Sequence, residues 1–219
     1  MAAQMGCPRS QRDPFPPLPR RRYAIIYADP PWDYGGQTQH GEAGRSADTG
    51  GASAHYSTVP LRTLKALPVA AISARDCLLF MWSSSPHLDQ AIALGGAWGF
   101  TWSTVAFVWD KIRLNPGHYT LSQCELCLVF KRGRIPSPRG ARNMRQYVRD
   151  ERGAHSRKPD EVRARIEAMF PTQSKIELFA RSLSPGWDSW GLEVAKETTV
   201  GEHPVAGWFN SGQLFMADS

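Results

Sequence analysis

The residues best suited to chemistry form one tetrapeptide, Asp29-Pro30-Pro31-Trp32, which directly follows the apolar run Tyr23–Ala28. This run predicts a buried strand, and ligands of open α/β sheets bind beyond the carboxyl ends of such strands. The prolines hold the backbone extended and leave the Pro30 carbonyl available as a hydrogen-bond acceptor. An ionised Asp29 only accepts hydrogen bonds, and Trp32 offers a flat apolar face. Two acceptors beside an aromatic ring suit a planar exocyclic amine such as that of adenine, although a Pro-Pro turn with a packed Trp explains the segment equally well.

Alternating strands and helices are predicted to position this tetrapeptide. Besides the first strand, we expect a helix whose apolar face includes Leu88, Ile92 and Leu94. The alternation indicates an α/β sheet with helices on both faces, contained in one domain of residues 23–196. The expected strands are residues 76–82, 101–109, 124–131, 174–180 and 187–194, and the expected helices are residues 60–67, 86–98 and 159–170.

Three segments fall outside this pattern. Residues 1–22 hold five prolines and end in three arginines, which predicts a poorly ordered basic arm. Residues 35–54 contain six glycines and no periodicity, so we expect a mobile loop that orders over the substrate. Residues 197–219 form a tail that the pattern does not place.

Positive charge is concentrated late in the chain. Residues 131–165 hold 12 Lys and Arg against 4 Asp and Glu, within a chain whose net charge is +6. Such a run is often a solvated face. Its richness in Arg, with Gly and Pro between, favours a loop over residues 131–157 that grips the phosphates of a nucleic acid.

Composition excludes several classes of protein. The 219 residues with 42% apolar content suffice for one domain, and apolar runs such as Cys77–Trp82 are too short to span a membrane. Four cysteines without a disulfide framework indicate a reducing cytosol. Cys124 and Cys127 have zinc-ligand spacing but no second pair, so we expect them in the core, and the six histidines form no ligand cluster. We expect no metal and no membrane association.

Eight short motifs occur in one order along the chain: Tyr27-Ala-Asp-Pro-Pro-Trp32, His55-Tyr-Ser-Thr58, Leu79-Phe-Met-Trp82, Gly117-His-Tyr-Thr120, Glu125-Leu-Cys-Leu128, His155-Ser-Arg-Lys-Pro-Asp-Glu161, Lys175-Ile-Glu-Leu-Phe-Ala-Arg181 and Gly186-Trp-Asp-Ser-Trp-Gly-Leu-Glu193. Together they make residues 23–194 resemble the MT-A70 family of adenine-N6 methyltransferases, and most of all its small DNA-modifying members from phages and bacteria. Any one motif alone is weak evidence.

The resemblance implies a Rossmann-like class I methyltransferase sheet that is circularly permuted, with the catalytic strand first and the cofactor half last. It implies S-adenosylmethionine as methyl donor, converted to S-adenosylhomocysteine, and direct in-line transfer to the N6 amine of a flipped or single-stranded DNA adenine. With no separate recognition domain in this length, we expect short or loose sequence specificity. We further expect a cytoplasmic protein of a bacterial host, acting as monomer or homodimer without an obligatory partner subunit.

The resemblance also assigns roles to residues. Asp29 and the Pro30 carbonyl would accept the two amine hydrogens and turn the nitrogen lone pair toward the methyl group, with Pro31 and Trp32 completing the catalytic segment. Lys158 would pair with the donor carboxylate, and Glu193 would accept a ribose hydroxyl. The expected cofactor-binding residues are Asp29, Lys158, Glu177, Phe179, Arg181, Ser184 and Glu193. The expected substrate-binding residues are Tyr34, Tyr56, Trp82, Trp109, Lys111, Arg113, Glu125, Arg139, Arg142 and Arg145.

The chain departs from the family pattern at three positions. Leu183 and Ser184 stand where some relatives have His and Asn, and Leu192 stands where Asn is common, which bears on the ribose contacts. Methylation of RNA by the same chemistry is the first alternative. A non-catalytic nucleic-acid-binding subunit is the second, but such subunits lose the Asp-Pro-Pro-Trp residues, which are all present here. The basic segment disfavours a small-molecule or protein amine as substrate.

Overall fold

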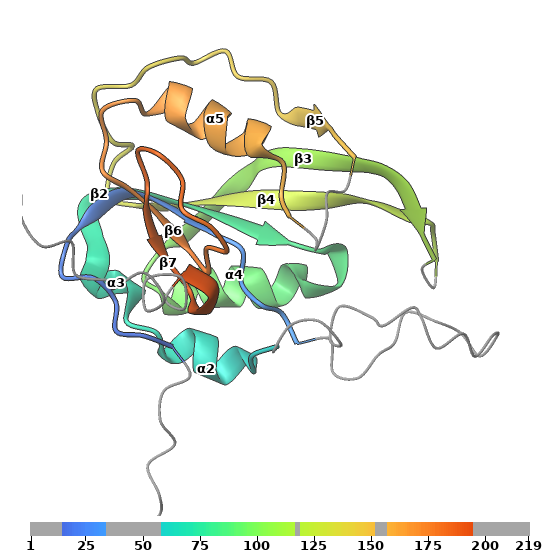
Figure 1. The fold of residues 1–219 in the computed structure, drawn as a ribbon, viewed down its shortest axis with the longest axis horizontal. Helices are drawn as coiled ribbons and strands as arrows, with labels where there is room; N and C mark the ends of the chain where they lie inside the picture. The colour runs from blue at the N-terminus through green and yellow to red at the C-terminus, as the bar shows by residue number, and fades with distance from the viewer. Residues whose placement is uncertain (1–14, 34–57, 117–118, 152–156, 195–219) are drawn as a thin grey trace, which may run out of the picture.

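A computed structural model describes residues 15–33, 58–116, 119–151 and 157–194 (Figure 1). Within them lies one seven-stranded sheet with the strand order β5-β3-β4-β2-β1-β6-β7. The strands are β1 (Tyr23–Ala28), β2 (Ser73–Ser83), β3 (Thr101–Asn115), β4 (Ser122–Arg132), β5 (Tyr147–Arg149), β6 (Lys175–Leu178) and β7 (Asp188–Trp190). The helices are α2 (Leu61–Ala66), α3 (Val69–Ile72), the 3-10 turn η1 (Ser85–His87), α4 (Leu88–Ala97) and α5 (Asp160–Met169).

The sheet is mixed, and Asp29 follows its parallel part. β1 runs parallel to both β2 and β6, and β6 runs parallel to β7. β3 and β4 form an antiparallel hairpin beside β2, and β5 returns parallel to β3. Because Ala28 pairs with Met81 on one side and Leu178 on the other, these three strands end together, and Asp29 emerges at their shared carboxyl edge. The predicted α/β class is confirmed.

Side-chain alternation along β1 divides the core into two layers. Ile26 and Ala28 belong to the layer under α2 and α4, whereas Ile25 and Tyr27 belong to the layer under α5. Figure 1 shows α5 on one face of the sheet and α2 with α4 on the other. Asp29 continues the odd-numbered series of β1, so it lies on the α5 side, where the late helix begins.

Several element boundaries differ from the prediction. β3 continues six residues beyond Trp109, and β5 and α3 were not predicted because three or four residues show no period. Ile92 is exposed rather than part of the apolar face of α4, which buries Ala91, Leu94 and Gly95 instead. In an α-helix, positions 91, 94 and 95 share one face and position 92 turns away.

Residues 15–22 do not behave as a free arm, which corrects the prediction for this part of residues 1–22. Phe15 is buried, with ring centroids 5.5 Å from Phe179 and 5.3 Å from Trp190. The Trp190 indole N–H donates to the carbonyl oxygens of Pro16 and Pro17 at 3.1 and 3.2 Å. The Pro-rich segment therefore closes the sheet edge at β7. Residues 35–54 and the tail 197–219 lie outside the described residues.

Two further predictions concern metals and membranes. Across the described ranges no group of three or more His, Cys, Asp or Glu is arranged to hold a metal ion. Cys127 is buried in the core as expected, and Cys124 is half-buried. The same ranges contain no helix of the length and apolarity needed to span a membrane.

Candidate active site

The tetrapeptide is fixed by backbone hydrogen bonds directly after β1. The Trp32 N–H donates to the Pro30 carbonyl at 2.9 Å, and the Val59 N–H donates to the Pro31 carbonyl at 3.0 Å. The Pro30 carbonyl is therefore not unoccupied, contrary to the sequence-based expectation. A carbonyl oxygen has two lone pairs, so one acceptor position remains.

Asp29 begins a chain of alternating charges that crosses four elements. Lys158, just before α5, places its Nζ 3.0 Å from Asp29 Oδ1 and 3.1 Å from Glu125 Oε2 on β4. The other carboxylate oxygen of Glu125 lies 3.2 Å from Nζ of Lys111 on β3. We call these four residues the charge chain. Their side chains are 7–20% exposed, so water screens the pairs only weakly.

The contacts of the charge chain shift the pKa values of two of its members, Lys158 and Glu125. Burial opposes charge on Lys158, but Asp29 and Glu125 outweigh it and raise the pKa of the ammonium above its ordinary value. Burial likewise opposes charge on Glu125, but Lys158 and Lys111 outweigh it and lower the pKa of the carboxyl. Glu125 and Lys158 are accordingly held charged at neutral pH.

Trp82 and Trp109 were expected to line a substrate pocket, but the structure places both in the core. They are 0% and 1% exposed, with ring centroids 6.1 Å apart in an edge-to-face pair. Their indole N–H groups donate to the Tyr27 hydroxyl and the Asp150 carbonyl. Lys158 Nζ lies over the Trp82 ring, 5.7 Å from its centroid, so a cation–π contact helps to hold the ammonium of the charge chain in place.

Trp32 was expected to wall the adenine pocket, and this expectation is corrected as well. The ring is 6% exposed, and its Nε1–H donates to the Trp82 carbonyl at 3.2 Å. A buried ring that is bonded to the end of β2 anchors the tetrapeptide and does not offer a stacking face.

A second charged pair lies on the same face of the sheet, at β6. Arg163 of α5 donates from Nε to Glu177 Oε2 at 3.1 Å and from Nη2 to Oε1 at 3.4 Å. Burial raises the pKa of Glu177, and the nearby guanidinium counteracts only part of the rise. On and just before the neighbouring strand β7, the buried Ser189 Oγ and Trp187 Nε1 have no hydrogen-bond partner among the described residues. Register places Ser189 opposite Glu177.

The remaining expected cofactor residues follow β6. Phe179 has φ +62°, a left-handed conformation that is uncommon for a bulky side chain, and its ring packs against Phe15, Trp98 and Trp190 rather than facing solvent. Arg181 and Ser184 are half-buried and Glu193 is exposed. Their contact with a donor stays a prediction.

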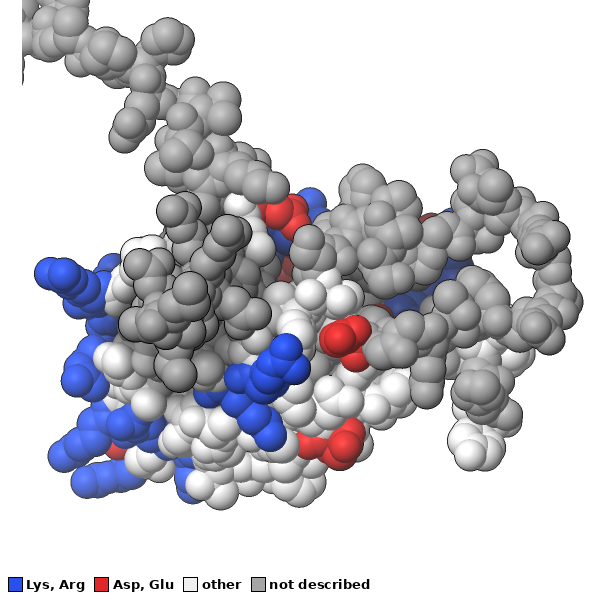
Figure 2. All heavy atoms as spheres, turned by 90° about the horizontal axis from the view of Figure 1, so that it is seen from below, with Lys and Arg blue, Asp and Glu red and all other residues white. Residues whose placement is uncertain are grey.

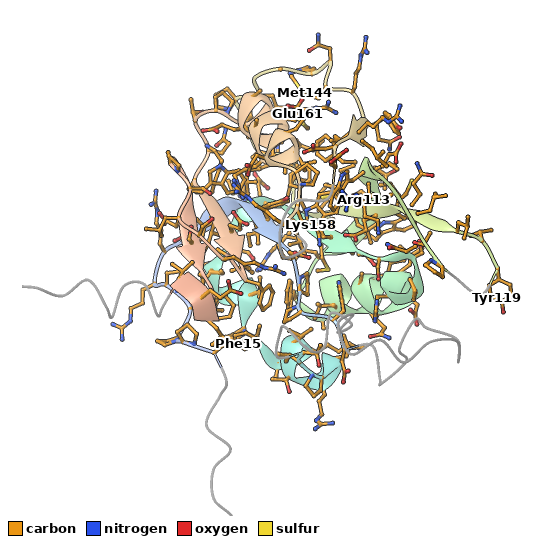
Figure 3. The ribbon with its side chains drawn as sticks, turned by 45° about the vertical axis from the view of Figure 1, so that its right-hand side comes forward. Phe15, Arg113, Tyr119, Met144, Lys158 and Glu161 are labelled. Atoms are coloured by element: carbon orange, nitrogen blue, oxygen red, sulfur yellow. The ribbon has the colours of Figure 1, made fainter. Side chains whose placement is uncertain are left out.

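Of the expected substrate residues, Tyr34 and Tyr56 lie outside the described residues. Glu125 is at the site but engaged by two lysines, and Lys111 is buried against it, so Lys111 is not available to a phosphate. Arg113 is exposed on the hairpin. Figure 3 shows Lys158 near the middle of the molecule, Arg113 on the hairpin to its right, and Tyr119 at the far right.

The basic segment does not border the site over its whole length. Residues 140 and 141 donate their backbone N–H groups to the carbonyls of Met169 and Ala168, at the end of α5 remote from Lys158. There Arg139 lies over the Phe170 ring at 5.6 Å, so it is a packing residue and not a free phosphate contact. The segment then follows α5 back toward β5, and Arg142 and Arg145 remain exposed.

Other basic residues gather at the opposite edge of the sheet. The Arg22 and Arg132 side chains donate to the carbonyls of Ser73 and Ala70, near the start of β2. Arg75 and Arg134 lie exposed at the same edge. Figure 2 shows Lys and Arg concentrated on the left side, the side on which β2 begins in Figure 1. Positive charge therefore lies on two separate surfaces, and net charge alone does not show which of them would bind a nucleic acid.

Sequence reasoning missed three site features. Arg163 and His87 were not singled out, because neither stands in a recognisable spacing with Asp29. The link from Lys111 through Glu125 to Lys158 depends on hairpin register, which places Trp109 opposite Glu125. A lysine two residues after a strand-end tryptophan is the only signal the sequence offers for it.

A mixed seven-stranded α/β sheet with helices on both faces, in which β1 leads into an ion-paired aspartate and two prolines, is consistent with a Rossmann-like methyltransferase. Residues 23–193 match the MT-A70 family model. The chain belongs to the MT-A70 family of methyltransferases, which confirms the resemblance read from the motifs.

The chain is similar to individual proteins at two levels of identity, 52% and 26–28%. The chain is 52% identical over 189 residues to the Type II methyltransferase M.MunI of Mycoplasma sp, covering 82% of this chain and 81% of that protein. It is 26% identical to the N(6)-adenine-specific methyltransferase METTL4 of Mus musculus, covering 80% of this chain and 38% of that protein. It is 28% identical to the N6-methyladenosine RNA methyltransferase MTA1 of Cryphonectria parasitica, covering 87% and 57%.

Proposed function

We propose that this protein transfers a methyl group from S-adenosylmethionine to the N6 amine of adenine in DNA. The observation that carries the proposal is the Asp29–Lys158 ion pair of 3.0 Å at the end of the central strand, in a chain of the MT-A70 family. The Lys158 ammonium has three N–H donors, and Asp29 and Glu125 engage two of them, so one remains to receive a donor carboxylate.

The residues of the chain supply positioning and electrostatics. The carboxylate of Asp29 and the second lone pair of the Pro30 carbonyl act as acceptors for the two amine hydrogens. Accepting both hydrogens directs the nitrogen lone pair away from the purine ring, which is what makes this weak nucleophile reactive. The backbone hydrogen bonds of Pro30 and Pro31 keep both acceptors in place before substrate arrives.

The donor site is tested by the polar groups that the structure leaves without partners. Ser189 Oγ and Trp187 Nε1 are buried without a hydrogen bond in the described part of the chain, and Ser189 is the β7 residue that pairs with Glu177. A hydroxyl, an indole N–H and a carboxylate together fit a ligand that carries sugar hydroxyls. Lys158 fits its carboxylate. The donor supplies an electrophilic methyl group when bound.

The order of the elements supports the proposed circular permutation. The strand that leads into Asp29 comes first in the chain and lies inside the sheet, between β2 and β6. The residues expected to hold the donor, Glu177, Arg181 and Glu193, lie on or after β6, the sixth strand. The catalytic half would thus precede the cofactor half in this chain.

DNA is favoured as the nucleic acid, because the relative of 52% identity is a type II methyltransferase, a designation that belongs to DNA methyltransferases. RNA is the second candidate, since the RNA methyltransferase MTA1 matches 87% of this chain at 28% identity. A short or loose recognition sequence, and action without a partner subunit, remain part of the proposal.

The test is incubation of the purified protein with labelled S-adenosylmethionine and matched DNA and RNA oligomers, single- and double-stranded, followed by digestion to nucleosides. We expect N6-methyldeoxyadenosine from DNA. Asp29→Asn keeps the shape but removes the charge and one acceptor, and we expect turnover to fall by about 10²–10³. Arg62→Ala, on the exposed side of α2, is the matched control and leaves turnover unchanged. Label in RNA alone, or undiminished turnover by Asp29→Asn, contradicts the proposal.

A further inference from the structure

The β3–β4 hairpin extends past the edge of the sheet on the side of the candidate site. β2 ends at Ser83, which pairs with Leu126 of β4, and Leu126 pairs with Val108 of β3. Beyond this point no described strand pairs with the hairpin on the β2 side. Asp110 pairs with Cys124 and Asn115 with Ser122, so β3 carries three more residues than β4 over this span. Figure 1 shows the pair reaching out to the right of the other strands. We call residues 110–116 and 119–124 the β-arm.

The outer part of the β-arm exposes apolar side chains. Ile112 is 37% exposed, Leu114 53%, Leu121 60% and Tyr119 99%. A cluster of large apolar side chains held away from the core is unusual on a protein that is not using it for contact. In Figure 3 Tyr119 marks the outer end of the described arm.

The charges of the β-arm suit a polyanion. Its one acidic residue among those described is Asp110, which is buried and accepts hydrogen bonds from the Tyr147 hydroxyl at 2.5 Å and the Gln123 amide at 2.7 Å. Arg113 is exposed between two apolar residues. An arm with exposed apolar groups, an exposed guanidinium and no exposed carboxylate matches the stacked bases and phosphates of a nucleic acid better than an average protein surface.

The base of the β-arm is tied to the charge chain. Glu125 directly follows the β-arm on β4, and its carboxylate contacts both Lys111 of the arm and Lys158, which holds Asp29. The arm therefore starts one ion-paired link away from the aspartate that is proposed to accept the adenine amine. A nucleic acid whose target base reaches Asp29 therefore passes the base of the arm.

The backbone of the β-arm is bent where it leaves the sheet. Ile112 has φ +64°, and its N–H donates to Asp110 Oδ1 at 2.8 Å, where the β3–β4 register shifts. A β-branched residue in the left-handed region is strained, and such strain persists where the surrounding contacts impose it. Irregularities of this kind redirect side chains next to active sites.

We propose that the β-arm enters a DNA duplex beside the target adenine and wedges Tyr119 and Leu121 into the stack, stabilising the gap that the extruded base leaves. This inference rests on the proposed function. A two-stranded ribbon fits the major groove, and an apolar wedge compensates for lost stacking when a base leaves the duplex. Arg113 would contact a flanking phosphate.

The experiment compares one target adenine in three settings: paired with thymine, opposite an abasic site, and in a single strand. The base opposite the abasic site is already unpaired, so it needs less help to leave the stack. We expect Tyr119→Ala combined with Leu121→Ser to lower kcat/KM on the paired duplex about tenfold or more. The same variant should lose less than about threefold on the other two substrates. Tyr119→Trp should retain paired-duplex activity, and Ile92→Ser, an exposed apolar residue of α4, is the matched control.

The outcomes separate the two proposals. Undiminished activity on the paired duplex, or an equal loss on all three substrates, overturns the wedge while the proposed function stands. A change of molar mass in light scattering together with an equal loss places a second copy of the chain on the β-arm and also overturns the wedge. A wild-type protein that methylates none of the three DNA substrates overturns both proposals.

Discussion

The Trp32 ring lies flat on the His87 imidazole, with centroids 5.6 Å apart and planes at 15°. His87 Nε2 is 3.3 Å from the Asp33 carbonyl oxygen, and Nδ1 is 2.8 Å from Ser84 Oγ. Because a carbonyl only accepts, Nε2 carries the proton, and the neutral ring accepts the Ser84 hydroxyl at Nδ1. Burial lowers the pKa of His87, which favours this neutral form. The His87 imidazole therefore holds Trp32 by stacking and Asp33 by a hydrogen bond, and we call these two contacts the clamp.

This clamp predicts graded effects of substitution at Trp32. Trp32→Phe keeps the stack on His87 but loses the hydrogen bond to the Trp82 carbonyl, so we expect a loss of about 1 kcal/mol in the free energy of unfolding. His87→Ala removes the stacked ring and two hydrogen bonds, and we expect a loss of about 2 kcal/mol. Urea denaturation measures both. Since the ring positions Asp29 and binds no donor, kcat should fall more than the donor KM rises, and the reverse pattern would contradict the clamp.

The local sequence pattern predicted much of the fold, but it did not predict how the Trp32 ring is oriented. Six apolar residues before Asp29 sufficed to place a strand and its end, because burial of β1 on both faces leaves a continuous apolar run. The direction in which Trp32 faces depends on η1, more than fifty residues later, and no spacing encodes it. The same holds for Lys111, whose burial follows from a hairpin register and not from its own neighbours. Long-range pairing is what the sequence alone left open.

Lys158→Met should lower the free energy of unfolding, because it breaks the charge chain. The substitution keeps the aliphatic stem but leaves Asp29 and Glu125 without their shared cation, and losing one partner of a buried pair costs about 3 kcal/mol at neutral pH. The cost should shrink as the pH falls toward 4, because Glu125, whose pKa Lys158 helps to hold low against burial, takes up a proton more readily once Lys158 is gone. Urea denaturation at pH 7.5 and pH 4 tests this. By calorimetry the dissociation constant for S-adenosylmethionine should also rise, while Lys65→Met, an exposed lysine of α2, changes neither quantity.

The wild-type chain should show a plateau of stability between the ordinary pKa values of Glu125 and Lys158. The pKa of Glu125 is lowered from 4.5, so its contribution is present above 4.5 and is lost as the pH falls through the lowered value. The pKa of Lys158 is raised from 10.5, so its contribution is present below 10.5 and is lost as the pH rises through the raised value. Glu125→Gln removes one partner of both lysines. The stability difference from wild type should therefore be constant from about pH 6 to pH 9 and decrease in acid; a difference that grows in acid would contradict this assignment.

Arg163 should control the ionisation of Glu177. Burial already raises the pKa of Glu177, and Arg163 opposes that rise, so Arg163→Met should raise the pKa further. A protonated Glu177 no longer accepts a hydrogen bond as a carboxylate, and donor affinity should then weaken as the pH falls from 8 to 6. Calorimetry with S-adenosylmethionine at both pH values measures the effect. Arg163→Lys should restore most of the wild-type profile, and Arg165→Met on the same helix is the control; a flat profile for Arg163→Met would remove Glu177 from donor binding.

The last prediction separates the two basic surfaces by salt dependence. Arg142 and Arg145 lie on the segment that returns along α5 toward β5 and the site, whereas Arg75 and Arg134 lie at the opposite edge of the sheet. Each lost contact to a duplex phosphate reduces the slope of log K against log salt by roughly 0.9. Replacing Arg142 and Arg145 by Ala should therefore reduce the slope by roughly 1.8 and weaken binding to all duplex sequences alike, with donor affinity unchanged.

The matched pair at the other edge makes this prediction specific. Arg75→Ala with Arg134→Ala removes the same charge from the same protein, so any effect of net charge alone appears equally in both double variants. Fluorescence anisotropy with one duplex between 50 and 300 mM salt gives both slopes. If the opposite-edge pair produces the larger change, DNA lies across the start of β2 and must wrap around the sheet edge to reach Asp29. Because the β-arm and the charge chain both stand at the carboxyl edge, we expect the slope to change only for Arg142 and Arg145.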